Sequence, residues 1–170
     1  CIRDRFHDGH ELTADDVVFT FGCFIDPAFI SPRKGAYRML ARIEAVDPYT
    51  VRIVLKEAFG SFPIQLVMTV VPKGAGPELL YHPVGTGPYR FVSFAVDDQV
   101  TLTAFPDYFR GKPSNGGVIL KVVPDEIMRA LELRKGTVDM VVNDLSPDVI
   151  HQLAAERSVT IAESPGTDYA

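Results

Sequence analysis

The chain has 170 residues, of which 46% are hydrophobic and 23% are charged. This length suits one ordinary domain or two small lobes with a hydrophobic core. The formal net charge of -5 argues against nucleic-acid and anionic-membrane partners, because such partners need a basic surface and no basic run offsets the charge locally.

The two cysteines of the chain do not define a compartment. Cys23 falls inside an apolar helical pattern, which predicts a small buried hydrophobe with an unreactive thiol. A disulfide between Cys1 and Cys23 would need their Cα atoms within bonding range, and the sequence alone does not place them there.

The first segment predicts two helices. Thr13 is a good N-cap, Asp15 and Asp16 suit the positive end of a helix dipole, and Asp26 followed by Pro27 ends the first helix. A second helix is predicted over residues 34–42, with one apolar face formed by Tyr37, Leu40 and Ala41.

A hairpin and a short helix are predicted next. Pro48 pre-sets a tight turn between two strands, and the second strand alternates apolar residues with Arg52 and Lys56. The run "GSFPIQLVM" resembles a short helix, and the Pro- and Gly-rich segment after it is the strongest break in composition. We therefore predict two domains, residues 1–82 and 83–170, with the lobe boundary near residue 83.

The second part predicts alternating strands and helices. A hairpin turning at Asp97-Asp98 is followed by the buried strand "GGVILKVVP" and by the helix "DEIMRALELRKG", with Gly136 as its C-cap. The strand "VDMVVND", the helix "SPDVIHQLAAER" and the strand "VTIAESPG" complete the pattern. This β-α-β-α-β order predicts a mixed α/β fold with crossovers and partly parallel pairing.

Catalytic and metal chemistry find little support. His7, Asp8 and His10 could be metal ligands, but Gly9 marks a turn and a solvated turn is the favoured interpretation. No serine stands in a G-x-S-x-G elbow, and the paired acids are explained by a helix start and by a turn. We therefore expect no enzyme activity, no metal and no cofactor.

The motif Gly85-Thr86-Gly87-Pro88 could be a phosphate loop or a structural corner. A dinucleotide loop needs a third glycine and a following helix, whereas here Pro88 removes an N–H and a strand begins at Tyr89. The favoured interpretation is a corner whose glycines take dihedral angles that other residues avoid.

Several motifs occur together in an order that resembles a known family. These are "FHDGHELTADDVVFTF", "VDPYTVRIVLKE", "PVGTGPYRF", "FPDYFRGKP", "LKVVPDEIMRALELRKGTVDM" and "SPGTDYA". Together they resemble the peptide/nickel family, family 5, of extracellular solute-binding proteins of ABC importers, over essentially the whole chain.

The resemblance implies a periplasmic-binding-protein-like architecture of two lobes that close on a ligand. It implies a receptor at the periplasmic or extracellular face of the membrane, lipid-anchored in some full-length forms, that passes peptides to a permease. Family members are about three times as long, so the chain is expected to be an internal piece: most of the small lobe and the start of the large one. Unpaired sheet edges and a bare lobe interface are expected to promote self-association of such a piece.

The resemblance also suggests ligand-binding candidates, although the family's main acidic anchor falls outside this chain. They are Lys34, Tyr37, Met68, Thr69, Val142, Asn143, Asp144, Thr167, Asp168 and Tyr169. Val142 departs from the tyrosine found there in some members, which weakens that contact. Tyr37 is equally explained as a core residue, and Asn143-Asp144 as a loop.

Three functions remain open from the sequence. The first is a peptide receptor of an importer, and the second is a receptor for a nickel chelate or another small ligand. The third is a sensory or regulatory protein that reuses the receptor fold.

Overall fold

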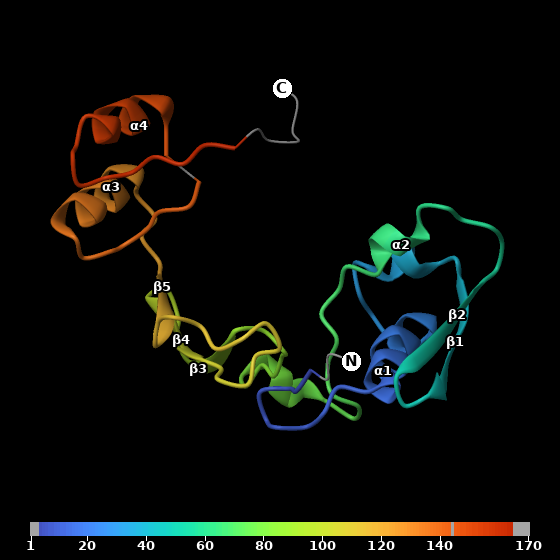
Figure 1. The fold of residues 1–170 in the computed structure, drawn as a ribbon. Coiled ribbons are helices and arrows are strands. Elements are labelled where there is room, and N and C mark those ends of the chain that lie inside the picture. Colours follow the sequence, from blue (N-terminus) through green and yellow to red (C-terminus); the bar gives the residue numbers. More distant parts are fainter. Residues whose placement is uncertain (1–3, 144, 165–170) are drawn as a thin grey trace. The chain divides into compact units, whose positions relative to one another are not determined.

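The computed structural model describes residues 4–143 and 145–164, and its elements belong to the mixed α/β class expected from the sequence (Figure 1). Contacts divide the chain into two units. The first unit comprises Cys1–Phe94 with Val100–Ile119, and the second comprises Ala95–Gln99 with Leu120–Ala170. The lobe boundary near residue 83 stays a prediction.

Helix α1, Ala14–Ile25, begins and ends as predicted. The backbone N–H and the hydroxyl of Thr13 both donate to Asp16 Oδ2, at 2.8 and 3.0 Å, while Asp16 N donates to Thr13 O. This reciprocal capping satisfies groups that the first turn cannot pair internally. At the other end Asp26 is the C-cap, and Pro27 stops the helix.

The helix predicted over residues 34–42 is wrong beyond its first turn. Residues Lys34–Tyr37 form only the 3₁₀ turn η1, and strand β1, Leu40–Asp47, begins three residues later. Strand pairing prevails because Leu40 lies opposite Leu55 of β2. Gly35 further weakens the helix, since glycine has a poor helix propensity.

The predicted hairpin is confirmed. Strand β2, Thr50–Leu55, pairs antiparallel with β1, with Ile43 opposite Ile53 and Asp47 opposite Thr50. The short helix α2, Phe62–Gln65, follows, with Pro63 in its first turn. In Figure 1, α1 lies against the β1–β2 hairpin.

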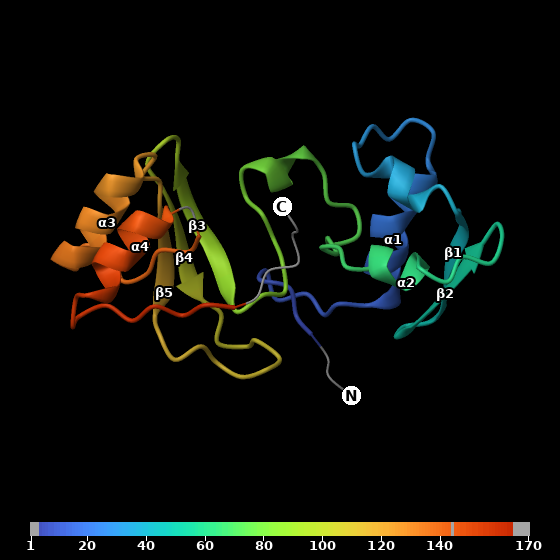
Figure 2. The same ribbon diagram turned by 90° about the horizontal axis from the view of Figure 1, so that it is seen from above.

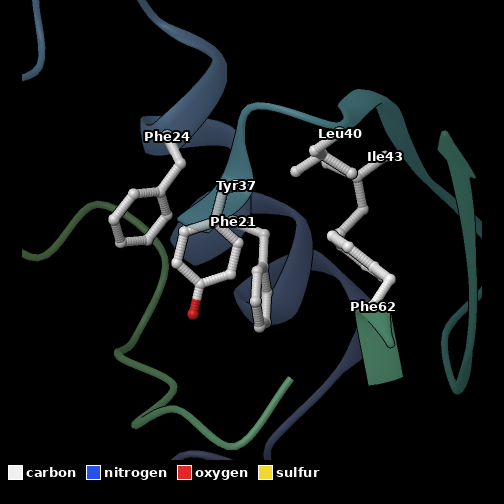
Figure 3. Close-up of a cluster of buried hydrophobic side chains, with 6 residues drawn as sticks. All are labelled: Phe21, Phe24, Tyr37, Leu40, Ile43 and Phe62. Atoms are coloured by element: carbon white, nitrogen blue, oxygen red, sulfur yellow. The ribbon is translucent and has the colours of Figure 1, made fainter. Parts of the chain in front are cut away.

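The core of the first unit lies between these elements. Its buried members are Phe21, Phe24, Tyr37, Leu40, Ile43 and Phe62. Figure 3 shows Tyr37 between Phe21 and Phe24, with ring centroids 5.6 and 4.3 Å from it. Alternate residues of β2, Val51, Ile53 and Leu55, pack against this cluster, as their spacing predicts.

A second sheet has the strand order β3-β4-β5 (Figure 2). Its strands are β3, Tyr89–Ala95, β4, Gln99–Ala104, and β5, Gly117–Lys121. The predicted turn at Asp97-Asp98 is confirmed, with Asp97 at a φ of 56°. Gly117 is required for close approach, because a Cβ there would lie 2.3 Å from the carbonyl oxygen of Leu102.

One prediction about this sheet is wrong. Strand β5 is not buried, since Ile119 and Leu120 expose 62% and 54% of their surface. Strands β4 and β5 run antiparallel, since Ala104 N donates to Gly116 O and Val122 N donates to Asp98 O. Because an antiparallel sheet can leave one face open, its apolar strand need not be enclosed by helices.

In the second unit, helices α3, Glu126–Lys135, and α4, Pro147–Ala154, pack together and are confirmed as predicted. Gly136 ends α3 with a φ of 70°, and Pro147 occupies the first turn of α4. The short 3₁₀ turn η2, Pro77–Leu80, belongs to the first unit. In the part of the chain that the structure describes, no helix combines the length and hydropathy needed to cross a membrane.

Two predicted strands are absent from the described residues. Residues 138–143 of "VDMVVND" and residues 159–164 of "VTIAESPG" form no ladder. Met140 and Val142 are 74% and 67% exposed, so this apolar run packs against no neighbouring strand. A strand is stable only with a partner for its backbone groups, and none of the described residues supplies one here.

Candidate functional site

The segment Gly85 to Tyr89 forms a half-buried connection that enters strand β3 at Tyr89. Neither Gly85 nor Gly87 takes a positive φ, so the prediction that these glycines need unusual dihedral angles is wrong. Their backbone is instead approached closely by His7, whose amide donates to Gly85 O at 2.9 Å and whose ring contacts Gly87 O at 3.0 Å.

The His7-Asp8-Gly9-His10 segment forms a turn, with Gly9 at a φ of 94°. Asp8 accepts from the backbone and the ring of His10 at 3.0 and 3.2 Å. Partial burial raises the pKa of Asp8, but the hydrogen bonds from His10 outweigh it and hold this pKa below its ordinary value. No group of three or more His, Cys, Asp or Glu side chains with metal-binding geometry occurs among residues 4–143 and 145–164.

A hollow of about 290 Å³ in the first unit brings together η1 and the α2 segment. Its lining residues are Arg33, Ala36, Tyr37, Ile64, Gln65 and Val67. Both elements are attached to the core of the unit, since Tyr37 of η1 and Phe62 of α2 belong to the buried cluster. The hollow therefore lies directly beside the buried core.

Tyr37 and Met68, two of the candidates from the sequence, do meet in the structure. The hydroxyl of Tyr37 lies 2.7 Å from Gln65 O and 3.1 Å from Met68 Sδ. With one proton, the hydroxyl donates to the carbonyl, the stronger acceptor. Tyr37 is only 4% exposed, so the core interpretation of its ring is confirmed, and the residue also lines the hollow. Thr69 is exposed.

Lys34, another candidate, has its ammonium group occupied by the protein. Its Nζ donates to the carbonyl oxygens of Asp26, Pro27 and Phe29 at 2.6, 3.0 and 3.0 Å. An ammonium group has three donors, so these contacts use its full capacity. The charge also lies next to carbonyls at the C-terminal end of α1, where a cation is favourable. Lys34 thus holds the 26–29 loop against η1.

Replacing Lys34 with methionine is expected to loosen this loop and to cost about 1 kcal/mol of stability, because the side-chain stem remains but its charged donors are lost. Hydrogen exchange at the amides of Ala28 and Phe29, which bond to Asp26, measures the change. Lys56→Met serves as the control, since Lys56 is exposed and has no recorded side-chain bond among the described residues. Equal exchange rates at these amides in the two variants would contradict the role of Lys34 in holding the 26–29 loop.

Arg33 is the residue that the sequence reasoning missed. It precedes Lys34, is exposed, lines the hollow and makes no recorded side-chain bond within the described part of the chain. Beside it lie Ile64 and Val67, which are 72% and 82% exposed. A guanidinium group next to apolar side chains suits a ligand that carries a carboxylate or another acceptor beside an apolar group. The doublet Arg33-Lys34 was the only signal in the sequence, and it does not reveal which cation is already occupied.

The remaining candidates are not assembled into this hollow. Val142 and Asn143 belong to the second unit and are exposed, and Asn143 has a φ of 58°, which fits the loop interpretation. The candidates Asp144, Thr167, Asp168 and Tyr169 lie outside the described residues, as does Cys1 with its possible disulfide. Cys23 is half-buried, and its thiol donates to Phe19 O.

Comparison with known proteins gives a consistent result. The family described as bacterial extracellular solute-binding proteins, family 5 Middle, matches residues 2–170. Di/tripeptide-binding protein 2 of Pseudomonas aeruginosa (strain UCBPP-PA14) is 30% identical over 183 residues, covering 94% of this chain and 34% of that protein. The chain therefore spans about a third of the length of this relative.

Solved structures agree with the sequence relatives. The oligopeptide-binding protein AppA from Bacillus subtilis, in complex with a nonapeptide, is 33% identical with a TM-score of 0.73, covering 79% of this chain and 29% of that one. The binding protein MoaA from A. tumefacien R10, in complex with mannopinic acid, is 32% identical with a TM-score of 0.82, covering 91% and 33%. These three relatives are all binding proteins, and their ligands differ in kind.

Proposed function

Because this chain belongs to the bacterial extracellular solute-binding proteins of family 5, we propose that it is part of the substrate-binding component of an ABC importer. In this role the protein captures a short peptide at the periplasmic or extracellular face of the membrane and delivers it to a permease. It binds without catalysing a reaction. The observation that carries the proposal is the family match over residues 2–170.

The hollow beside η1 is the proposed ligand contact of the first unit. Arg33 supplies fork-shaped donors for a carboxylate or a backbone carbonyl of the ligand, and Ile64 and Val67 supply apolar contact. Gln65 adds a side chain with both donor and acceptor. This combination recognises general features of a peptide rather than one particular side chain.

A small anionic ligand is the second candidate. It is supported by the mannopinic acid complex of MoaA, which is 32% identical to this chain. The same guanidinium group would serve a sugar acid, since a carboxylate is common to both ligand classes. The two candidates therefore differ in the rest of the ligand and share the Arg33 contact.

Replacing Arg33 with alanine in the full-length protein that carries this sequence is expected to weaken ligand binding about 10- to 100-fold, the effect of losing a charged hydrogen bond. Calorimetry with di-, tri- and longer peptides, and with a sugar acid, measures the dissociation constants. Arg38→Ala is the matched control, because Arg38 is exposed on the same segment but does not line the hollow. Equal dissociation constants for the two variants would show that Arg33 does not contact the ligand.

The ligand class is tested separately by mass spectrometry of molecules that co-purify with the full-length protein. A peptide supports the leading proposal, and a sugar acid or a metal chelate supports a small-ligand receptor. Absence of binding to every ligand tested, in a folded protein, would overturn the transport proposal.

A further inference from the structure

Asn115 is held by hydrogen bonds at both polar atoms of its side-chain amide. Its Oδ1 accepts from the hydroxyl of Tyr89, the first residue of β3, at 2.5 Å. Its Nδ2 donates to the carbonyl oxygen of Gly117, the first residue of β5, at 2.9 Å. The orientation of the amide follows from these partners, because a carbonyl can only accept and therefore faces the NH₂ group. The side chain of Asn115 thus connects the beginnings of two strands of one sheet.

The residue after Asn115 is Gly116, and this pair is chemically reactive in an unrestrained chain. The amide nitrogen of Gly116 attacks Asn115 Cγ and forms a C–N bond, while the Cγ–Nδ2 bond breaks and ammonia leaves with the proton of the attacking amide. Water then opens the cyclic succinimide at either carbonyl, which yields aspartate or isoaspartate. Glycine favours the attack because it has no Cβ to hinder the approach and because its backbone adopts many conformations. Both residues are exposed, so water reaches them.

The folded structure restrains this reaction at the side chain and at the backbone. Ring closure requires Asn115 Cγ to move into bonding distance of Gly116 N, and the rotation that brings it there carries the amide away from Tyr89 and Gly117. The departing nitrogen, Nδ2, is itself one of the two bonded atoms. The backbone is held as well, since Gly116 O accepts from Ala104 N at 2.9 Å. Closure of the ring therefore costs the hydrogen bonds that the folded chain has made.

We propose that Asn115-Gly116 is a site of spontaneous deamidation, and that the hydrogen bond from Tyr89 slows the reaction in the folded protein. Tyr89 is a positioning residue in this scheme, because its hydroxyl holds Oδ1 and takes no part in the bonds that form or break. The inference concerns a modification of the chain itself, so it goes beyond the ligand binding proposed above.

Deamidation is expected to disrupt the start of β5. A carboxylate at position 115 still accepts from Tyr89, but it has no N–H for Gly117 O and places two acceptors against each other. Isoaspartate also adds one main-chain atom directly before Gly116. The strand has little room for such a shift, because a Cβ on Gly117 would lie 2.3 Å from the carbonyl oxygen of Leu102. The product should therefore pair less well with β4.

Tyr89→Phe, made in the full-length protein that carries this sequence, removes the hydroxyl and keeps the ring. Deamidation of Asn115 is expected to become about 3- to 10-fold faster, the effect of losing one net hydrogen bond. Tyr108→Phe is the matched control, because Tyr108 lies in the connection between β4 and β5 and its hydroxyl has no recorded bond among the described residues. This variant is expected to deamidate at the rate of the unmodified protein.

Gly116→Ala tests the attacking group. Position 116 accepts a Cβ without a clash, since no atom within 4 Å would meet it there. The added methyl group hinders the approach of the amide nitrogen to Asn115, so deamidation is expected to slow several-fold. The same slowing is expected when Gly116→Ala is combined with Tyr89→Phe.

Peptide mapping by mass spectrometry, after incubation in mildly alkaline buffer, measures the conversion in the tryptic peptide of residues 111–121. Trypsin releases this peptide whole because Pro113 blocks cleavage after Lys112. Asn143, the other asparagine of the chain, precedes Asp144, whose side chain hinders the attack, so it serves as a slow internal reference. Circular dichroism shows whether each variant is folded, and protein denatured in guanidinium chloride gives the unrestrained rate.

Slower conversion of Asn115 in the folded protein than in the denatured protein, with acceleration by Tyr89→Phe alone, supports the proposal. Equal rates in Tyr89→Phe and Tyr108→Phe overturn the role of Tyr89. Conversion that is as fast in the folded as in the denatured protein, that is unchanged by Gly116→Ala, or that is absent from the denatured protein overturns the site. Should Tyr89→Phe fail to fold, the folded and denatured unmodified protein and Gly116→Ala still decide whether the fold restrains a reactive Asn115.

Discussion

Replacing Phe21 with alanine is expected to lower the free energy of unfolding of the first unit by about 3 to 5 kcal/mol, the usual cost of emptying an aromatic core site. Phe21 is 3% exposed, and its ring packs edge-to-face on Tyr37. The core around it is small: α1 packs against a two-stranded hairpin, and Tyr37 of η1 and Phe62 of α2 complete the buried cluster (Figure 3). Loss of the Phe21 ring would therefore remove a large part of the contacts that hold α1 against the hairpin.

Denaturation in urea, followed by far-UV circular dichroism, measures this loss. Ile30→Ala is the control, because Ile30 is 95% exposed and its truncation should change stability by less than about 0.5 kcal/mol. Phe21→Leu should lie between the two, since it fills part of the space. A stability of Phe21→Ala close to that of Ile30→Ala would mean that this cluster does not form the core.

Replacing Asp16 with alanine is expected to cost about 2 to 3 kcal/mol, because it leaves buried donors without acceptors. The carboxylate of Asp16 accepts from Thr13 at the start of α1 and from the amide of Lys73, at 2.8 Å, in the segment after α2. That segment is also held by Thr20, whose hydroxyl accepts from Val71 N at 3.0 Å. Asp16 thus joins helix capping to the attachment of a distant segment.

The contribution of Asp16 should also depend on pH. Burial raises the pKa of this carboxyl, but the hydrogen bonds from Thr13 and Lys73 outweigh burial and hold the pKa below its ordinary value. The stabilisation is therefore fully present above the ordinary carboxyl pKa of about 4 and is lost as the pH falls through the lower value in the folded protein. Urea titrations at several pH values measure it.

Asp16→Asn tests the charge separately from the shape. This variant should lose most of the acid sensitivity below about pH 4 that belongs to this site. Asp15→Asn is the control, because Asp15 is exposed and forms a surface ion pair with Lys73 at 2.9 Å, a contact of small energetic value. If Asp15→Asn destabilised the protein as much as Asp16→Ala, the proposed anchoring role of Asp16 would be wrong.

Elements governed by neighbouring residues were predicted well from the sequence. The capping pair Thr13 and Asp16, the stop at Pro27 and the C-cap Gly136 act within one or two helical turns, so local chemistry determines α1 and the end of α3. The β1–β2 hairpin was equally accessible, because its turn and the alternation in β2 lie within one short segment.

Errors arose where a partner elsewhere in the chain decides the outcome. Tyr37 and Leu40 have helical spacing, but Leu40 pairs with Leu55 and becomes part of a strand. The apolar run at Met140 has strand composition, yet no described residue pairs with it. Composition indicates how readily a segment adopts the extended conformation of a strand. A β-ladder also requires a second segment that lies beside it and pairs with its backbone.

The sequence alone was sufficient for the family, the mixed α/β class and the local elements, because ordered motifs and short-range caps are properties of consecutive residues. Only the tertiary structure distinguished Lys34, whose ammonium group is occupied by three carbonyls, from Arg33, which faces the hollow. It alone joined His7 to Gly85 and Gly87. The physical reason is that a side chain's role depends on which donors and acceptors meet it in space, and those partners lie far away along the chain.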